Sequence, residues 1–481
     1  MGLNKKTSTI FTCTVIILTV LVLSLIYMQR MVNSSLPTLS TSGGLLFLYS
    51  VVVTLLFIYG IVVTPFLLTK IIMAYRYKPV PDRGYRPYIS VIVPVLNEGK
   101  VISRTIRALL DSEYPKEKLE IIVVNDGSTD NTEEEIMKFP EVKYVNLSKN
   151  MGKRHAFAKG VKEFAHGEIM ICVDSDSIVD KKALMLLVQP FTDHDVMCAC
   201  GHGDVLNKKH SLLTWLQRVW YADGFRLIKA FESQFNMVTC CSGLLAAYRK
   251  SGLNSQVLNK WLNETFMGQT VIDSDDRRMT NLLMKSVINA PGEDVTLTNF
   301  AMKKRYAKSM YQSNAIAYTV VPDNTKTFVR QQLRWGRGSF RGMLFAATFF
   351  WRRPLKQSLL FYLSTFVNYG SPFILLLNLI VLPLMGFWYP AVIYSCGLLL
   401  IHFIHGLTDN RLLADFTYKD VFYRTIFVGL STFISLIYLY AWVTAWQGKK
   451  WMTREMPQKT VGGSVGFLKT PLLKLHRGQK E

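Results

Sequence analysis

Two aspartates one residue apart are the first candidates for chemistry in this chain. Asp174 and Asp176 follow the apolar run at residues 169–173. An apolar run without alternation predicts a strand buried on both faces, and open α/β sheets bind ligands at the carboxyl ends of such strands. Hard divalent cations prefer oxygen ligands. The pair therefore predicts a site that holds a divalent cation against a diphosphate, although a plain acidic turn after a strand has the same pattern.

Two further polar segments lie where a nucleotide would need them. Asp126 belongs to a loop that follows the apolar run 119–124, at the place where a base and ribose bind in α/β sheets. Lys153 and Arg154 open a predicted helix, and two cations at a helix start favour a diphosphate. Each segment alone also fits a capped turn or a solvated basic helix end. Their succession along alternating strands and helices favours a nucleotide site.

Composition limits the class of protein. The chain has 481 residues, is 49% hydrophobic and carries a formal net charge of +22. A basic chain suits an anionic membrane surface or a nucleic acid, and the long apolar runs favour the membrane over nucleic acid. A polyanionic substrate or product is also compatible with this charge. The seven cysteines show no CxxC or zinc spacing, which predicts free thiols in a reducing compartment.

The apolar runs predict where the membrane segments lie. Residues 8–28 and 45–72 form a predicted transmembrane hairpin within 1–80, and flanking basic residues place the N-terminus in the cytoplasm. Residues 86–335 then form a predicted cytoplasmic α/β domain with alternating strands and helices. The basic and aromatic stretch that follows predicts an amphipathic interfacial helix at 336–356.

The C-terminal part contains three more apolar runs. Residues 359–384, 391–405 and 421–446 make up a predicted transmembrane region at 357–447. Three crossings would place the basic tail, 448–481, outside the cell, against the positive-inside rule. We therefore expect one run to be re-entrant, bent or interfacial, with the tail in the cytoplasm of a multi-pass plasma-membrane protein.

A series of motifs spans nearly the whole chain. In order, they are Pro94-Val95-Leu96-Asn97-Glu98, Asn125-Asp126-Gly127-Ser128, Gly152-Lys153-Arg154-His155-Ala156, Asp174-Ser175-Asp176, Cys241-Ser242-Gly243, Trp261-Leu262-Asn263-Glu264-Thr265-Phe266-Met267-Gly268, Gln331-Gln332-Leu333-Arg334-Trp335 and Trp451-Met452-Thr453-Arg454. This series resembles the processive, membrane-embedded family 2 glycosyltransferases, and among them most closely the hyaluronan synthases. The Asp-x-Asp and Gln-x-x-Arg-Trp motifs are shared with cellulose and chitin synthases. The Lys-Arg-His-Ala turn and the Asn-x-x-Phe-x-Gly segment are more specific.

The resemblance implies a GT-A-type domain inserted between transmembrane helices, UDP-glucuronic acid and UDP-N-acetylglucosamine as substrates, and a growing polysaccharide that leaves through the membrane. It implies Mg²⁺ or Mn²⁺ bound by Asp176 and Asp174. The remaining implied binding residues are Asn97, Asp126 at the uridine, Lys153, Arg154 and Arg334 as positive charges, Gln331, and Trp335 under the acceptor sugar. One carboxylate base without a covalent nucleophile implies inversion and β-linkages.

The general base has two candidates, because an acidic motif occurs twice. Asp276 lies in Asp275-Asp276-Arg277-Arg278-Met279-Thr280-Asn281, and Asp294 lies in the similar segment Glu293-Asp294-Val295-Thr296-Leu297-Thr298-Asn299. The first copy has the better spacing from Asn263. The second copy has the better spacing from Gln331, and we prefer Asp294. Asp276 stays the alternative.

Other departures bear on the sugar. Leu244 stands where the synthases have proline, their Glu-Arg-Ala is missing from residues 225–234, and residues 336–341 resemble the nodulation chitooligosaccharide synthases. A chitin or poly-N-acetylglucosamine synthase is therefore the alternative, ahead of a lipid-phosphate sugar transferase and a non-enzymatic adaptor. An enzyme that uses glucuronic acid needs a cation free of the diphosphate, and the candidates are Lys153, Arg154, Arg249 and Arg337. The sequence leaves monomer and homo-oligomer open.

Overall fold

The computed structural model describes residues 43–263, 265–266, 269–270, 279, 307–409 and 418–445. The chain divides into two units, Met1–Met73 and Ala74–Glu481. Helix α2, Gly43–Arg76, supplies the described part of the first unit, and its segment Thr54–Arg76 is long and apolar enough to cross a membrane. The first predicted span, 8–28, and the tail, 448–481, lie outside the described residues.

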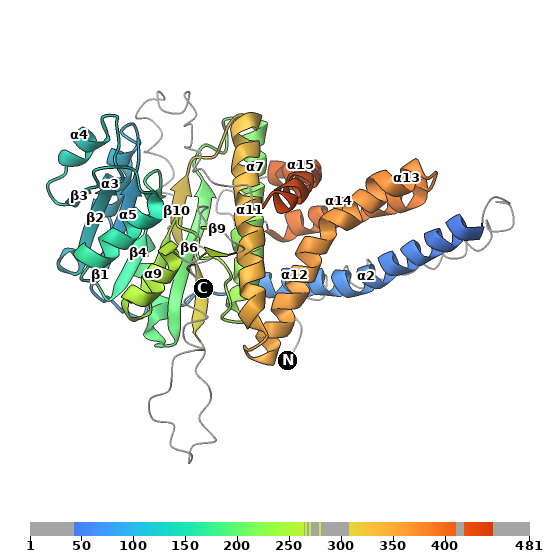
Figure 1. The fold of residues 1–481 in the computed structure, drawn as a ribbon, viewed down its shortest axis with the longest axis horizontal. Coiled ribbons are helices and arrows are strands. Elements are labelled where there is room, and N and C mark those ends of the chain that lie inside the picture. Colours follow the sequence, from blue (N-terminus) through green and yellow to red (C-terminus); the bar gives the residue numbers. More distant parts are fainter. Residues whose placement is uncertain are drawn as a thin grey trace, which may run out of the picture. The chain divides into compact units, whose positions relative to one another are not determined.

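An eight-stranded mixed sheet forms the centre of the second unit, with the order β3-β2-β1-β4-β7-β6-β10-β5 (Figure 1). Strands β1, β2, β3 and β4 run parallel, whereas β7 is antiparallel to both of its neighbours. The strands are β1 Ile89–Val95, β2 Leu119–Asn125, β3 Lys143–Asn146, β4 Ile169–Cys172, β5 Ile178–Val179, β6 Val196–Val205, β7 Ala246–Arg249 and β10 Lys308–Thr319. This is the α/β architecture that the sequence predicted.

The apolar runs form the strands for the expected reason. Every residue of β1 and β4 is buried, as an apolar run without alternation predicts for a central strand covered on both faces. Ile89 is opposite Leu119 of β2 and Ile169 of β4, so these parallel strands start at the same level. Their carboxyl ends consequently meet at one edge of the sheet.

Short helices cover the sheet and connect the strands. In α3, Ile102–Leu110, the residues Ile102, Ile106 and Leu109 lie on one face and are buried against the sheet. The other elements of this part are η2 Lys116–Lys118, α4 Thr132–Met137, α5 Lys153–Lys159, η3 Gly160–Phe164, α6 Ala183–Leu187, η4 Gln189–Thr192, η6 Lys250–Gly252, α9 Ser255–Asn263 and the hairpin β8 Thr265–Phe266 with β9 Gln269–Thr270. None of these elements is long enough to span a membrane.

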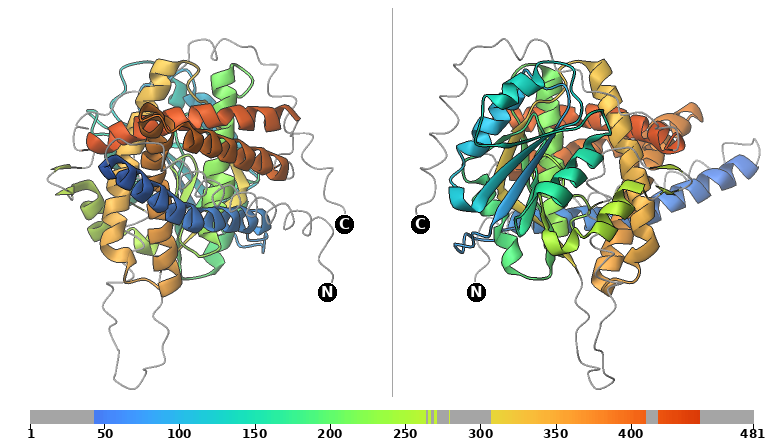
Figure 2. Two further views of the ribbon diagram at one scale, coloured as in Figure 1. Left: turned by 90° about the vertical axis from the view of Figure 1, so that its right-hand side faces the viewer. Right: turned by 60° about the vertical axis from the view of Figure 1, so that its left-hand side comes forward.

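Longer helices pack beside this domain. Helices α7, Leu212–Ala222, and α11, Thr325–Phe350, lie between the sheet and helices α12, α14 and α15 (Figures 1 and 2). The π-helical segment η5, Asp223–Lys229, and α8, Ala230–Ser233, continue α7 without a break. The C-terminal elements are α12 Leu355–Leu376, η7 Leu377–Val381, α13 Leu382–Leu384, α14 Trp388–Asp409 and α15 Tyr418–Val443.

Two of the three predicted C-terminal spans are long and apolar enough to cross a membrane in the described structure. They are Leu355–Leu384 and Phe422–Val443. The third run belongs to α14, in which the apolar stretch Trp388–Leu400 was found among the residues whose side chains the structure describes. The expectation that one of the three runs is re-entrant, bent or interfacial stays a prediction.

Helix α11 differs from the predicted interfacial helix in two respects. It is one continuous helix, so the expected domain end at residue 335 falls inside it. Phe345, Phe349 and Phe350 are buried in the protein core, and the Phe350 ring stacks on Phe361 of α12 with 4.0 Å between centroids. Trp351 is 60% exposed. The helical period identified an apolar face correctly, but it does not distinguish a face that meets lipid from one that meets another helix.

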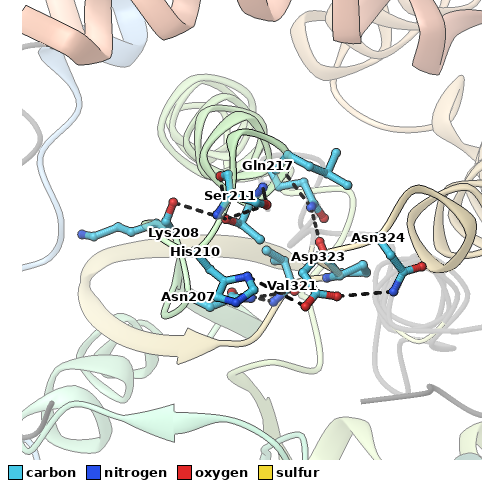
Figure 3. Close-up of polar contacts among 11 residues, drawn as sticks. Asn207, Lys208, His210, Ser211, Gln217, Val321, Asp323 and Asn324 are labelled. Atoms are coloured by element: carbon cyan, nitrogen blue, oxygen red, sulfur yellow. Dashed lines mark hydrogen bonds and ion pairs between the residues drawn. The ribbon is translucent and has the colours of Figure 1, made fainter. Parts of the chain in front are cut away.

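Hydrogen bonds fasten the starts of α7 and α11 to each other (Figure 3). The Asn207 amide donates to the Val321 carbonyl (2.8 Å) and accepts from the Val321 N–H (3.0 Å). The Gln217 amide donates to the Pro322 carbonyl at 2.7 Å. Ser211 and Asn324 cap the two helices by accepting from the N–H groups of Thr214 and Thr327. These bonds hold the two helices in one relative position.

The described cysteines are free thiols, as their spacing predicted. They are Cys172, Cys198, Cys200, Cys240, Cys241 and Cys396.

Candidate functional site

Asp174 and Asp176 lie directly beyond the carboxyl end of β4, as the apolar run predicted. The Asp174 carboxylate forms an ion pair with the Lys153 ammonium of α5. Asp176 is only 8% exposed. The turn between them is held because the Thr105 hydroxyl donates to the Ser175 carbonyl at 2.8 Å. Both carboxylates therefore have restricted positions at the edge of the sheet.

The loops after β1 and β2 are joined through Asn97. Its backbone N–H donates to the Ser128 hydroxyl (2.9 Å), and its side-chain oxygen accepts from the Thr129 N–H (2.8 Å). Asn97 adopts a left-handed backbone conformation with φ 53°, which asparagine tolerates better than most residues. Asn97 thus organises the loop beside the expected nucleotide position.

Asp126 holds the next loop in place. Its two carboxylate oxygens accept from the N–H groups of Met151 and Gly152, each at 2.8 Å. Burial raises the pKa of Asp126, while these two backbone donors and the charge of His155 act in the opposite direction. Asp126 therefore orders the turn that precedes α5, in addition to the uridine contact implied by the resemblance.

Helix α11 supplies the expected acceptor residues. Trp335 packs edge-on against Trp220 of α7, with 6.1 Å between ring centroids, and lies 6.2 Å from the Tyr221 ring. Burial raises the pKa of the Tyr221 hydroxyl, the negative charge of Asp174 raises it further, and the positive charge of Arg334 lowers it. Tyr221 therefore experiences both the β4 carboxylate and the α11 cation.

Gln331 is 7% exposed. Its side-chain oxygen has no hydrogen-bond partner among the residues that the structure describes. A buried carbonyl oxygen without a donor is unfavourable, so a hydroxyl or amide of a bound molecule would satisfy it.

One cavity of about 730 Å³ brings these side chains together, a volume suited to a substrate. Every predicted site residue that the structure describes lines it: Asn97, Asp126, Lys153, Arg154, Asp174, Asp176, Gln331, Arg334 and Trp335. Asp276 and Asp294 lie outside the described residues. The cavity wall is continued by Ser364, Thr365, Asn368 and Tyr369 of α12 and by Tyr438 and Trp442 of α15.

The residues present are suited to a divalent cation that is bound together with its substrate. Within the described ranges no three His, Cys, Asp or Glu side chains are grouped as metal ligands. Asp174 and Asp176 would therefore hold the ion with help from diphosphate oxygens and water. Mg²⁺ typically binds phosphate substrates in this way.

Two basic residues that we considered for a carboxylate substrate point elsewhere. The Arg249 guanidinium donates to the carbonyls of Phe191 (2.7 Å) and Val196 (3.0 Å), and Arg337 donates to the Thr444 hydroxyl at 3.0 Å. Neither lines the cavity. Sequence proximity to a motif failed here because a side chain's direction depends on the tertiary fold.

The cavity also contains residues that the sequence analysis missed. Tyr221, Phe225 and Lys229 line it from the continuous helix α7–η5. Their spacing of four residues is the only signal that the sequence contains for a shared helical face. Glu232 and Thr239 also line the cavity.

The fold and the motifs agree with known proteins. Residues 90–255 match the model of glycosyl transferase family 2. Hyaluronan synthase of Streptococcus pyogenes is 28% identical over 286 residues, which are 57% of this chain and 62% of that protein. The N-acetylglucosaminyltransferase of Neorhizobium galegae is 31% identical over 273 residues, 55% of this chain and 58% of that protein. The chain thus spans about three fifths of the length of these relatives.

A solved structure supports the fold. Mannosyltransferase PcManGT from Pyrobaculum calidifontis, determined in complex with GDP-Man and Mn²⁺, superposes with a TM-score of 0.50 at 16% identity, covering 81% of this chain and 99% of that one. This level of identity supports the fold alone. Together with the match of residues 90–255 to the family model, it shows a GT-A-like glycosyltransferase fold for this part of the chain.

Proposed function

We propose that this protein is a membrane-embedded, processive, inverting glycosyltransferase that forms hyaluronan from UDP-glucuronic acid and UDP-N-acetylglucosamine and extrudes it. The observation that carries the proposal is the cavity lined by the predicted site residues. It joins the strand-end carboxylates of β4 to the Gln-x-x-Arg-Trp side chains of α11 and to the wall formed by α12 and α15. The similarity to a hyaluronan synthase supports the choice of product.

The donor half of the cavity is suited to a nucleoside diphosphate. Lys153 and Arg154 line it from α5, and Arg334 lines it from α11. These cations would bind the diphosphate and stabilise the charge that develops as the nucleotide leaves. A divalent cation bound by Asp176 and Asp174 would supply further positive charge to the leaving diphosphate. Asp126 and Asn97 would order the loops around the uridine.

The acceptor half contains aromatic surface. Trp335, supported by Trp220, offers an apolar face on which a sugar ring could stack. We propose Asp294 as the base that takes the proton of the acceptor hydroxyl, with Asp276 as the alternative. A positioned base contributes about 10²–10⁴-fold to the rate. Attack by the acceptor itself, without a covalent enzyme intermediate, inverts the anomeric configuration.

The α12 and α15 wall suggests where the polymer leaves. Asn368 and Tyr369 belong to the candidate span Leu355–Leu384, and Trp442 belongs to Phe422–Val443. The Trp442 ring lies 4.7 Å from Tyr369, and its N–H has no hydrogen-bond acceptor within the described part of the chain. Aromatic faces and unused donors suit a saccharide. We propose a multi-pass plasma-membrane enzyme whose catalytic domain is cytoplasmic.

The experiment uses purified full-length protein in lipid nanodiscs with Mg²⁺ or Mn²⁺. Each UDP-sugar is supplied alone and in pairs, and polymer is measured from radiolabelled sugar. We expect polymer only when UDP-glucuronic acid and UDP-N-acetylglucosamine are both present, and we expect hyaluronidase to digest it. A preparation that forms polymer from another UDP-sugar but none from this pair would contradict the proposal.

A second candidate is a synthase that uses UDP-N-acetylglucosamine alone and makes chitin, a chitooligosaccharide or poly-N-acetylglucosamine. The observation in its favour is the 31% identity to the N-acetylglucosaminyltransferase of Neorhizobium galegae. High yield from UDP-N-acetylglucosamine alone, with a product that chitinase degrades, would support chitin. A polymer from the same donor that resists both enzymes would indicate another linkage.

A further inference from the structure

Lys229 is a buried cation that faces the cavity. It ends η5, is 8% exposed and lines the cavity wall. Its ammonium lies 3.9 Å from the centroid of the Phe225 ring. Among the described residues no carboxylate forms an ion pair with Lys229. The acid nearest to it in sequence, Glu232, accepts instead from the N–H (2.9 Å) and the hydroxyl (3.0 Å) of Thr239.

An ammonium in this position is not fully compensated by the protein. Removing an ammonium from water costs more free energy than one contact with an aromatic face returns. An anionic group that enters the cavity would provide the missing counter-charge and form a charge-assisted hydrogen bond. The position of Lys229 decides which anionic group that is.

Lys229 lies on the same helical face as Tyr221 and Phe225, at the far end of η5. Tyr221 experiences the charges of Asp174 and Arg334, and Phe225 stacks beside it with 6.2 Å between centroids. Lys229 follows Tyr221 by eight residues along α7 and η5, and its side chain leans back toward Phe225. The ammonium therefore lies beside Phe225, one helical turn along the cavity wall from Tyr221.

The other basic candidates have partners. Lys153 pairs with Asp174, and Arg154 donates to the Trp261 carbonyl at 2.9 Å. Arg249 and Arg337 do not line the cavity. We propose that Lys229 binds the C6 carboxylate of the uronic acid donor and is the residue that selects this donor over neutral sugars. The inference rests on the proposed function and deepens it by naming a residue for one of the two substrates.

The test compares two donors that differ only at C6. UDP-glucuronic acid has a carboxylate there, and UDP-glucose has a hydroxymethyl group. Equilibrium binding of both donors and of UDP is measured with full-length protein in nanodiscs. We expect the wild type to bind UDP-glucuronic acid at least about tenfold more tightly than UDP-glucose, which corresponds to about 1.4 kcal/mol. Lys229→Met should bring this ratio close to one, whereas Lys229→Arg should keep most of it.

Two controls separate selection from folding. Lys159→Met removes a lysine that pairs with Glu163 outside the cavity wall, and should keep the wild-type ratio. The affinity for UDP alone shows whether Lys229→Met still forms the nucleotide site. Lys229→Gln serves in its place if the methionine variant does not fold, because glutamine removes the charge and keeps polarity.

Three results would overturn the inference. One is a Lys229→Met ratio equal to that of the wild type. Another is an equal loss of affinity for UDP, UDP-glucose and UDP-glucuronic acid, which would place Lys229 at the diphosphate or give it a structural role. The third is a wild type that does not discriminate between the two donors.

If the wild type makes hyaluronan and the variant still discriminates, only the inference about Lys229 fails. If the wild type polymerises UDP-N-acetylglucosamine alone, the proposed function has failed as well.

Discussion

At the scale of single residues, the two β4 carboxylates differ in their surroundings. Asp174 is paired with Lys153, whereas Asp176 is the more deeply buried and belongs to the cavity wall beside it. We propose that Asp176 takes the larger share of metal binding because its carboxylate is the more deeply buried of the two. The two positions are therefore not interchangeable.

Asp176→Asn should abolish polymer synthesis. The change keeps the shape of the side chain but removes the negative charge that a divalent cation requires. Since Asp176 lies beyond the end of β4, the unfolding midpoint of the purified variant should change little. Asp111→Asn, at an exposed residue after α3, is the control and should retain full activity. A fully active Asp176→Asn enzyme would contradict the metal assignment.

The duplicated acidic motif allows a paired test of the base. Asp294→Asn should lower the polymerisation rate at least about a hundredfold, because a positioned base contributes that much or more. Binding of UDP should persist in this variant, since the nucleotide residues are unchanged. Asp276→Asn should have a mild effect in the same assay. The reverse result would assign the base to the first copy.

Much of the site could be predicted from residue types alone. Asp126 and Asp174 each follow an apolar run, and parallel strands that start at the same level end at the same edge, so both loops lie at one edge of the sheet, on either side of β1. Lys229 could not be predicted in this way. A lysine on a helix usually lies in solvent, and only the tertiary packing of η5 buries this one.

At the scale of elements, the loop after β2 and the turn before α5 depend on a close approach of their two backbones. Gly127 has φ 74°, and a Cβ built there would lie 2.7 Å from the Asn150 nitrogen and 2.8 Å from the Lys149 carbonyl carbon. The turn that it touches continues to Met151 and Gly152, whose N–H groups bind Asp126. Contact between these loops thus positions the residues before α5.

Gly127→Ala should lower the affinity for UDP at least about tenfold, which is about 1.4 kcal/mol. Gly84→Ala is a matched control, because Gly84 has φ 73° and a Cβ there would meet nothing within 4 Å. Both variants carry the same cost of a left-handed alanine, roughly 1–2 kcal/mol. Calorimetric titration with UDP should therefore distinguish them. Equal losses would mean that backbone strain, and not the approach of the two loops, is responsible.

The elements show where sequence periodicity stops being informative. The strands β1, β2 and β4 were predictable because buried parallel strands are apolar throughout. The buried face of α11 has two different partners. Phe349 packs into the domain core, whereas Gly336 lies against α15, where an added Cβ would be 2.9 Å from the Ala441 methyl group. A single sequence does not report which partner a buried face has.

At the scale of the whole second unit, one ion pair connects the catalytic domain to the C-terminal helices. The Arg424 guanidinium of α15 binds the Asp223 carboxylate at the start of η5. The two residues are 201 positions apart in the chain, so no local pattern predicts their contact. The pair anchors the helical segment that carries Phe225 and Lys229 to a candidate membrane span.

Asp223→Asn should destabilise the protein and disturb donor binding together. The Arg424 side chain is 4% exposed, and a buried charge that loses its partner typically costs about 3 kcal/mol or more. The double variant Asp223→Leu with Arg424→Met removes both charges and should recover part of the loss, because apolar replacements avoid the uncompensated charge. Thermal unfolding in nanodiscs measures the first effect, and UDP-glucuronic acid affinity measures the second.

If η5 is held mainly through this pair, the double variant regains stability but not full donor affinity, since α15 no longer orients the segment. Unchanged unfolding of Asp223→Asn would show instead that packing of α15 on α7 and α11 is sufficient to connect the two parts.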